Sequence, residues 1–167
     1  MRRLFLFSMI ACCLCFSISV MAESRKQKKA DADTDKFRYE LEYVKTAGTG
    51  MVNVKIWSYS KKSSIAAEQN KKNAVHGVIF KGFSGNGSAQ RPLVKDPSAL
   101  SNHADFFDAF FSDGGDYLRY VTNVTGPTET MKIGKEYKIA AEVTVNKDLL
   151  RQHLEKANII RSLGSGF

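Results

Sequence analysis

Polar and apolar residues alternate from residue 37 to residue 43, and this alternation predicts a strand. Every second side chain in the segment is apolar, so one side of it is expected to face a core. The alternation returns at residues 52–56, and the turn residues 46–50 join the two segments. Two strands with a tight connection predict an antiparallel hairpin that runs on into Trp57 and Tyr59.

Two further strands are predicted in the second half of the chain. The clearest alternation runs from Tyr137 to Val145, where lysine, alanine, glutamate and threonine separate the apolar residues. Another strand is expected at residues 117–124, with a turn at Gly126 and Pro127 after it.

A helix is predicted at residues 65–81, because small and apolar residues recur there at helical spacing. Ser63 and Ser64 are candidate N-cap residues. Gly82 is placed to end the helix in a left-handed conformation. Gly77 lies within the segment, where its lack of a side chain is expected to let the helix approach the sheet closely.

The chain from residue 82 to residue 102 has no sustained period, and it is rich in glycine, proline and serine. A connection of this length is uncommon unless it is mobile or functional. A short helix is expected next, with Asn102 as its cap, Asp105 in its first turn and a wide aromatic face. That face consists of Phe106, Phe107, Phe110 and Phe111. Core burial is the favoured interpretation, with exposure of Phe107 or Phe111 as the alternative.

Asn146 is expected to cap a last helix that contains Leu149, Leu150, Leu154 and Ala157. The predicted order is therefore strand, strand, helix, helix, strand, strand, helix. This order predicts an α+β fold, with about four strands in an antiparallel or mixed sheet and two to three helices packed on one face. With 167 residues, the chain is expected to hold one such domain, at residues 37–167.

Residues 1–22 have the pattern of a secretory signal peptide: two arginines, an apolar run and small residues before Glu23. Cleavage after Ala22 is the favoured interpretation, and an uncleaved membrane anchor is the alternative. The expected product is exported to the periplasm or cell envelope of a bacterium, with outer-membrane association left open.

All three cysteines, Cys12, Cys13 and Cys15, fall within residues 1–22. The exported product is therefore expected to contain no disulfide, thiolate metal site or cysteine nucleophile. Residues 9–12 loosely resemble the lipidation signal of bacterial lipoproteins. Membrane contact is expected only if Cys12 is lipidated or the signal peptide is retained.

The formal net charge is +8, and it falls to +6 without Arg2 and Arg3. Within residues 23–36 the cations Arg25, Lys26, Lys28 and Lys29 are followed by the anions Asp31, Asp33 and Asp35, and almost no residue is apolar, so the segment is interpreted as a charged linker. Such a mixed segment does not provide a sustained surface for phosphates. No nucleic-acid partner is expected.

No catalytic residues, metal ligands or cofactor site are predicted. Whether the chain is an enzyme stays uncertain, and a protein without enzymatic activity is the favoured interpretation. The three histidines, His76, His103 and His153, lack the short spacing that a zinc site needs. The nearest cluster for acid and base chemistry is His103, Asp105 and Asp108, which supports a hydrolase of envelope polymers as one alternative.

The favoured function is a non-enzymatic module that binds a protein or another component of the envelope. Long loops and exposed aromatic residues often form binding surfaces. The candidate binding residues are Trp57, Tyr59, Phe83, Gly85, Asn86, Gly87 and Arg91. A further alternative is binding of an anionic glycan or lipid headgroup through Lys61, Lys62, Lys71, Lys72 and Lys81.

A resemblance is carried by residues 66–76 (AAEQNKKNAVH), residues 134–139 (GKEYKI) and residues 150–160. With these segments the chain resembles a group of uncharacterised exported proteins of Bacteroidetes-type bacteria. Its layout is also distantly similar to small outer-membrane lipoproteins and to N-terminal domains of flagellar assembly proteins. The resemblance implies a role in envelope assembly or interaction and supplies no catalytic motif.

Overall fold

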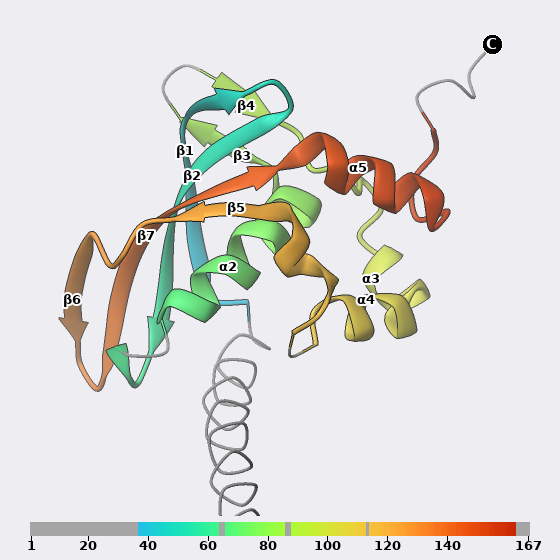
Figure 1. The fold of residues 1–167 in the computed structure, drawn as a ribbon. Coiled ribbons are helices and arrows are strands. Elements are labelled where there is room, and N and C mark those ends of the chain that lie inside the picture. The colour runs from blue at the N-terminus through green and yellow to red at the C-terminus, as the bar shows by residue number, and fades with distance from the viewer. Residues whose placement is uncertain (1–36, 64–65, 86–87, 113, 163–167) are drawn as a thin grey trace, which may run out of the picture.

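A five-stranded antiparallel sheet forms the centre of the molecule in the computed structural model, which describes residues 37–63, 66–85, 88–112 and 114–162. Helices lie on one face of this sheet, and a two-stranded hairpin packs beside it (Figure 1). The α+β fold with an antiparallel sheet and helices, predicted from the sequence, is confirmed. The predicted signal peptide and linker, residues 1–22 and 23–36, lie outside the described residues.

The sheet is built around its longest strand, β7 (Glu136–Asn146). On one side β7 pairs with β2 (Met51–Ser60), which pairs with β1 (Tyr39–Gly48). On its other side β7 pairs with two short strands in succession, β5 (Val121–Val124) and β6 (Glu129–Ile133). All of these pairings are antiparallel.

The first predicted helix is present as α2 (Ala66–His76) and a π-helical turn, Gly77–Lys81. It ends at Gly82, where φ is 69°, a conformation that favours glycine. At Gly77 a Cβ atom would lie 2.3 Å from Leu41 Cδ1 of β1. The glycine therefore allows the helix to pack closely on the sheet, as predicted.

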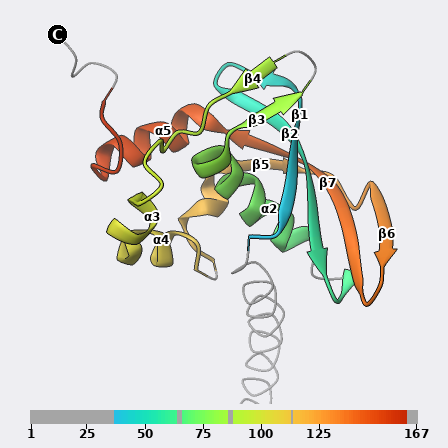
Figure 2. The same cartoon turned by 180° about the vertical axis from the view of Figure 1, so that it is seen from behind.

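Three more helices follow: α3 (Ala99–Asn102), α4 (Ala104–Phe110) and α5 (Lys147–Lys156). The predicted cap of α5 is confirmed, because Asn146 Oδ1 accepts a hydrogen bond from Leu149 N at 3.0 Å. In both views these helices lie at the end of the molecule opposite to β6 (Figures 1 and 2).

Several local predictions were wrong. Residues 82–102 contain a hairpin, β3 (Phe83–Gly85) with β4 (Ser88–Gln90), instead of continuous irregular loop. Strand β6 was not predicted at all. Residues 116–120 form a 3₁₀ turn before β5 begins. Asn102 ends α3, and His103 occupies the N-cap position of α4 without a capping hydrogen bond from its side chain.

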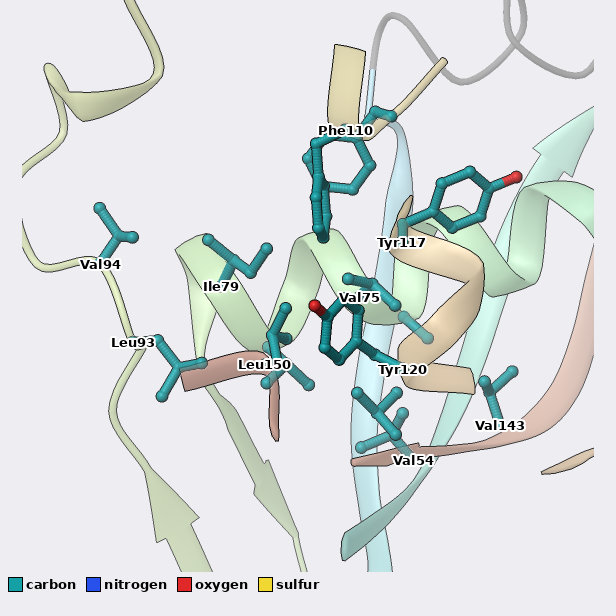
Figure 3. Close-up of a cluster of buried hydrophobic side chains, with 14 of the residues drawn as sticks. Val54, Val75, Ile79, Leu93, Val94, Phe110, Tyr117, Tyr120, Val143 and Leu150 are labelled. Atoms are coloured by element: carbon teal, nitrogen blue, oxygen red, sulfur yellow. The ribbon is translucent and has the colours of Figure 1, made fainter. Parts of the chain in front are cut away.

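The hydrophobic core lies between one face of the sheet and the helices (Figure 3). Val54 and Val143 of the sheet are fully buried, as are Val75 and Ile79 of the helix that crosses it. The aromatic side chains of α4 extend this core outward from α2. Phe107, Phe110 and Phe111 are buried and Phe106 is half-buried, so core burial is confirmed for three of the four residues, and the alternative of an exposed Phe107 or Phe111 is wrong.

His76 is a buried polar residue within this apolar region. Its Nδ1 atom lies 2.7 Å from the Tyr39 hydroxyl, and the Phe37 ring stacks on its imidazole with a centroid distance of 3.5 Å. Burial, helped by the charge of Lys81, lowers the pKa of His76 to about 3. His76 is therefore neutral at pH 7 and acts as a polar member of the core.

Within the described residues, no helix has both the length and the hydrophobicity needed to span a membrane.

Candidate functional site

The two faces of the sheet have different surroundings. Helix α2 packs against β2 and β7 on one face, which we call the covered face. No described helix lies over the alternate side chains of the same strands, which form the open face. From the strand registers, the open face carries Glu40, Glu42, Asn53, Lys55, Trp57, Tyr59, Glu129, Met131, Ile133, Lys138, Ala140, Glu142 and Thr144.

Aromatic and cationic side chains interleave at the middle of the open face. Lys55 Nζ lies 4.6 Å and Lys138 Nζ 4.9 Å from the centre of the Trp57 ring. Ala140 lies directly opposite Trp57 in the register and is fully buried. Because no described helix covers this position, the long side chains around Ala140 must themselves form a layer over the strands. Cation–aromatic contacts stabilise that layer.

Glu40 fixes the edge of this layer by accepting two hydrogen bonds. Lys138 Nζ and the Tyr59 hydroxyl each donate to it at 2.7 Å. The bond from Lys138, and then that from Tyr59, lowers the pKa of Glu40, while the same contacts raise the pKa values of Lys138 and Tyr59. Each group is thus held in its ordinary protonation state at neutral pH, and the charges balance locally.

Exposed apolar side chains lie where the open face reaches β6. Met131 is 44% and Ile133 is 51% exposed. Met131 is the register partner of Lys138, which in turn is the partner of Tyr59. The lower part of the face therefore offers apolar, aromatic and charged groups side by side, a mixture found at protein and ligand contacts.

A polar groove is present at the other end of the open face, where β1 and β5 flank β2 and β7. The groove has a volume of about 620 Å³. It is lined by Lys45, Thr46, Ala47, Met51, Asn53, Thr122, Thr125, Glu142 and Thr144. Asn53 Nδ2 donates a hydrogen bond to Glu142 Oε2 at 2.9 Å across its floor.

The structure separates the predicted binding residues. Trp57 and Tyr59 are half-buried neighbours on the open face. Phe83 was expected to be exposed, and this is wrong: only 6% of it is exposed, and its ring stacks on Tyr43 with a centroid distance of 5.8 Å.

The remaining candidates belong to the segment around the β3–β4 hairpin. Gly85 has φ 156°, and a Cβ atom there would lie 2.6 Å from the Tyr43 carbonyl oxygen. Its role is therefore close packing against β1. Asn86 and Gly87 lie outside the described residues, and Arg91 is an exposed residue after β4.

The cluster proposed for acid and base chemistry is not organised as a site. Asp105 and Asp108 are exposed on α4 and His103 is half-buried. Across residues 37–63, 66–85, 88–112 and 114–162, no hydrogen bond or ion pair joins these three side chains. In those same residues, no group of three or more histidines, cysteines or acidic residues is arranged to hold a metal ion.

Of the lysines proposed for an anionic ligand, the structure buries Lys72 and leaves Lys61, Lys62 and Lys81 exposed. Lys72 is buried, and its Nζ lies 5.6 Å from the centre of the Tyr117 ring. Lys81 Nζ lies 3.7 Å from the centre of the Tyr39 ring, and burial lowers its pKa. The expectation is therefore wrong for Lys72, and the binding of an anionic ligand by the other lysines stays a prediction.

No family model, curated protein or solved structure matches this chain.

Proposed function

We propose that this chain is an exported, non-enzymatic module that binds another component of the bacterial envelope through the open face of its sheet. The observation that carries the proposal is the contrast between the two faces. One is sealed by α2, and the other presents half-exposed aromatic rings and ordered charges.

Support for export comes from the chain itself. Residues 1–22 have a basic start, an apolar run and small residues before Glu23, which is the pattern of a secretory signal. The three cysteines all lie in that stretch. A body without cysteine needs no disulfide chemistry after export.

Support for binding comes from the composition and order of the open face. Met131 and Ile133 leave apolar surface in water on β6, and only Lys138 of β7 separates Met131 from Tyr59 in the register; exposed apolar groups that gather in one place mark interaction sites. The ion pairs around them, Lys138 with Glu40 and Lys55 with Glu129, hold long side chains in place before a partner arrives. Ordering these side chains in advance lowers the entropy cost of association.

Co-sedimentation with bacterial envelope fractions tests this proposal. The doubly substituted chain Tyr59→Ala, Met131→Ser is expected to lose retention about tenfold or more relative to the wild type, because it removes anchors at the centre of the contact. Leu100→Ser is the matched control, since Leu100 is an exposed apolar residue on α3, away from the open face. Equal retention of all three proteins would contradict the proposal.

A second candidate is the binding of an anionic ligand, at a different place from the lysines first considered. A groove of about 550 Å³ beside α5 is lined by Arg119, His153 and Lys156, with Tyr120 hydrogen-bonded to His153. The cations Arg119 and Lys156 favour a phosphate or carboxylate. Retention on immobilised phosphate at low salt that is lost in Lys156→Gln would favour this candidate, and unchanged retention would exclude it.

A further inference from the structure

Irregularities in β1 and β5 shape the polar groove at the end of the open face. In β1 the register shifts between Tyr43 and Lys45, so that Lys45 becomes the partner of Asn53 on the open face. In β5 the register shifts between Val121 and Asn123. Bulges bend strands and re-aim side chains, and they are frequent beside functional sites. A second shift in β1, between Thr46 and Gly48, lies on the same side of the groove as the first, and the shift in β5 lies on the other side.

Two threonines hold the walls of the groove in place. Thr125 Oγ1 accepts a hydrogen bond from Glu142 N at 2.9 Å and donates to Glu142 O at 3.4 Å. Thr122 Oγ1 donates to Thr144 O at 3.4 Å. These hydroxyls are occupied by the backbone of β7. The groups left for a ligand are the side chains of Lys45, Asn53, Glu142 and Thr144.

Asn53 carries an unmet hydrogen-bonding requirement in the groove floor. It is only 7% exposed. Because its Nδ2 donates to Glu142, its Oδ1 faces away from that carboxylate, and Oδ1 has no partner among the described residues. The opposite amide orientation would place two oxygens together, so the carboxylate fixes the orientation. Buried acceptors normally have a donor, and Oδ1, which is closed off from solvent in this conformation, can take one from a ligand O–H group when the Asn53 side chain turns toward the groove.

The charges in the groove select the kind of ligand. The ammonium group of Lys45 and the carboxylate of Glu142 cancel each other, so neither a strong anion nor a strong cation is favoured. The remaining groups are a mixture of donors and acceptors: an ammonium, an amide, a hydroxyl and a carboxylate. A ligand with several hydroxyls matches this mixture, because each hydroxyl both donates and accepts.

The geometry points to a neutral saccharide as the ligand of this groove, an inference that rests on the proposed function and names the component that is bound. The volume of about 620 Å³ falls within the range of about 300–1,000 Å³ usual for ligand sites. Trp57 lies four residues after Asn53 along β2 and on the same face. The rise per residue of a strand puts the two residues about 13 Å apart. A sugar chain that leaves the groove along the open face reaches this aromatic ring.

Titration calorimetry with neutral trisaccharides of glucose, mannose and N-acetylglucosamine tests the inference on the full chain. At least one of them is expected to bind, and Thr144→Val is expected to weaken it about tenfold, because a buried hydroxyl partner is lost. Glu142→Gln is expected to act in the same direction. Thr130→Val is the control, since Thr130 lies on β6, outside the groove.

Each outcome is decisive. If no trisaccharide binds, the inference fails, and the co-sedimentation experiment still decides the proposed function by itself. If a trisaccharide binds equally to the wild type, Thr144→Val and Thr130→Val, the groove is not its site and the inference also fails. Should Glu142→Gln not fold, as judged by its thermal unfolding, the conservative Thr144→Val change still gives the answer.

Discussion

The covered and open faces of the sheet are made by alternate residues of the same strands, yet they obtain their order in different ways. On β2, Val54 and Ile56 are fully buried beneath helices. Between and beyond them, Lys55 and Trp57 lie against each other in a layer one side chain thick. Apolar burial on the covered face stabilises the fold. The open face is therefore not needed for a core and is available for recognition.

The largest expected effect is on the covered face. Ile56→Ala is expected to lower the free energy of unfolding by about 3–4 kcal/mol, because it leaves a cavity in a packed core. Tyr59→Ala, on the open face of the same strand, is expected to cost about 1 kcal/mol, the scale of a cross-strand contact. Urea unfolding of both variants measures the difference. Equal costs would show that the open face is as essential to the fold as the core.

Gly82 and Gly114 share φ 69° but differ in how closely their surroundings pack. At Gly82 a Cβ atom would lie 2.4 Å from the Gln90 carbonyl oxygen, whereas at Gly114 nothing lies within 4 Å. Gly114→Ala is expected to cost about 1–2 kcal/mol, the strain of a left-handed residue. Gly82→Ala is expected to cost more, because the backbone must also move. Thermal unfolding that ranks the pair in the opposite order would contradict this account of the helix end.

The covered face contains a pH-dependent element, the buried side chain of His76. Burial holds the pKa of His76 at about 3, below its ordinary value of 6.5. As pH falls below 6.5 the unfolded chain takes up the proton first, so the stability present above that pH is lost progressively toward pH 3. Between pH 7 and pH 5 this loss is expected to be about 2 kcal/mol.

His76→Gln is expected to remove that pH-dependent loss, whereas His103→Gln is expected to retain it. Urea midpoints at pH 7 and pH 5 provide the measurement. A loss of the same size in all three proteins would assign the effect to another group.

The smallest effect is expected for an ion pair at the surface. Lys55 and Glu129 pair across the open face, and Glu129→Gln is expected to cost about 0.5 kcal/mol or less because water screens such pairs. A loss comparable to that of Ile56→Ala, measured by urea unfolding, would mean that the charged layer supports the fold as strongly as the core does.

The main strands and helices were predictable because burial on one side leaves a pattern in the sequence. The alternation from Tyr137 to Val145 lies within β7, and Asn146 caps α5 as expected. Strand β6 left no such pattern, since all five of its residues are exposed. β6 is defined by its pairing with β7, and the sequence of a short segment does not show which other strand it pairs with.

The candidate site was predictable only in part, for the same reason. Trp57 and Tyr59 stand on an alternating strand, so their common face followed from the sequence. Phe83 has no neighbours in sequence that indicate its stacking on Tyr43. The polar groove depends on bulges in β1 and β5, and a one-residue shift in register is not encoded by composition. The alternation in β2 did place Asn53 on the polar side of the strand, and this was the one sequence feature that pointed to the groove.

Photo-crosslinking from single cysteines tests most directly whether the open face is the binding surface. With Cys12, Cys13 and Cys15 replaced by serine, one cysteine is introduced at Glu42 or Met131 on the open face, or at Gln152 on α5 or Asp108 on α4. Each is labelled with a benzophenone maleimide and irradiated with an envelope fraction. The account predicts adducts from the positions of Glu42 and Met131 and none from the two helical positions. Adducts that form only from the helical positions would contradict it.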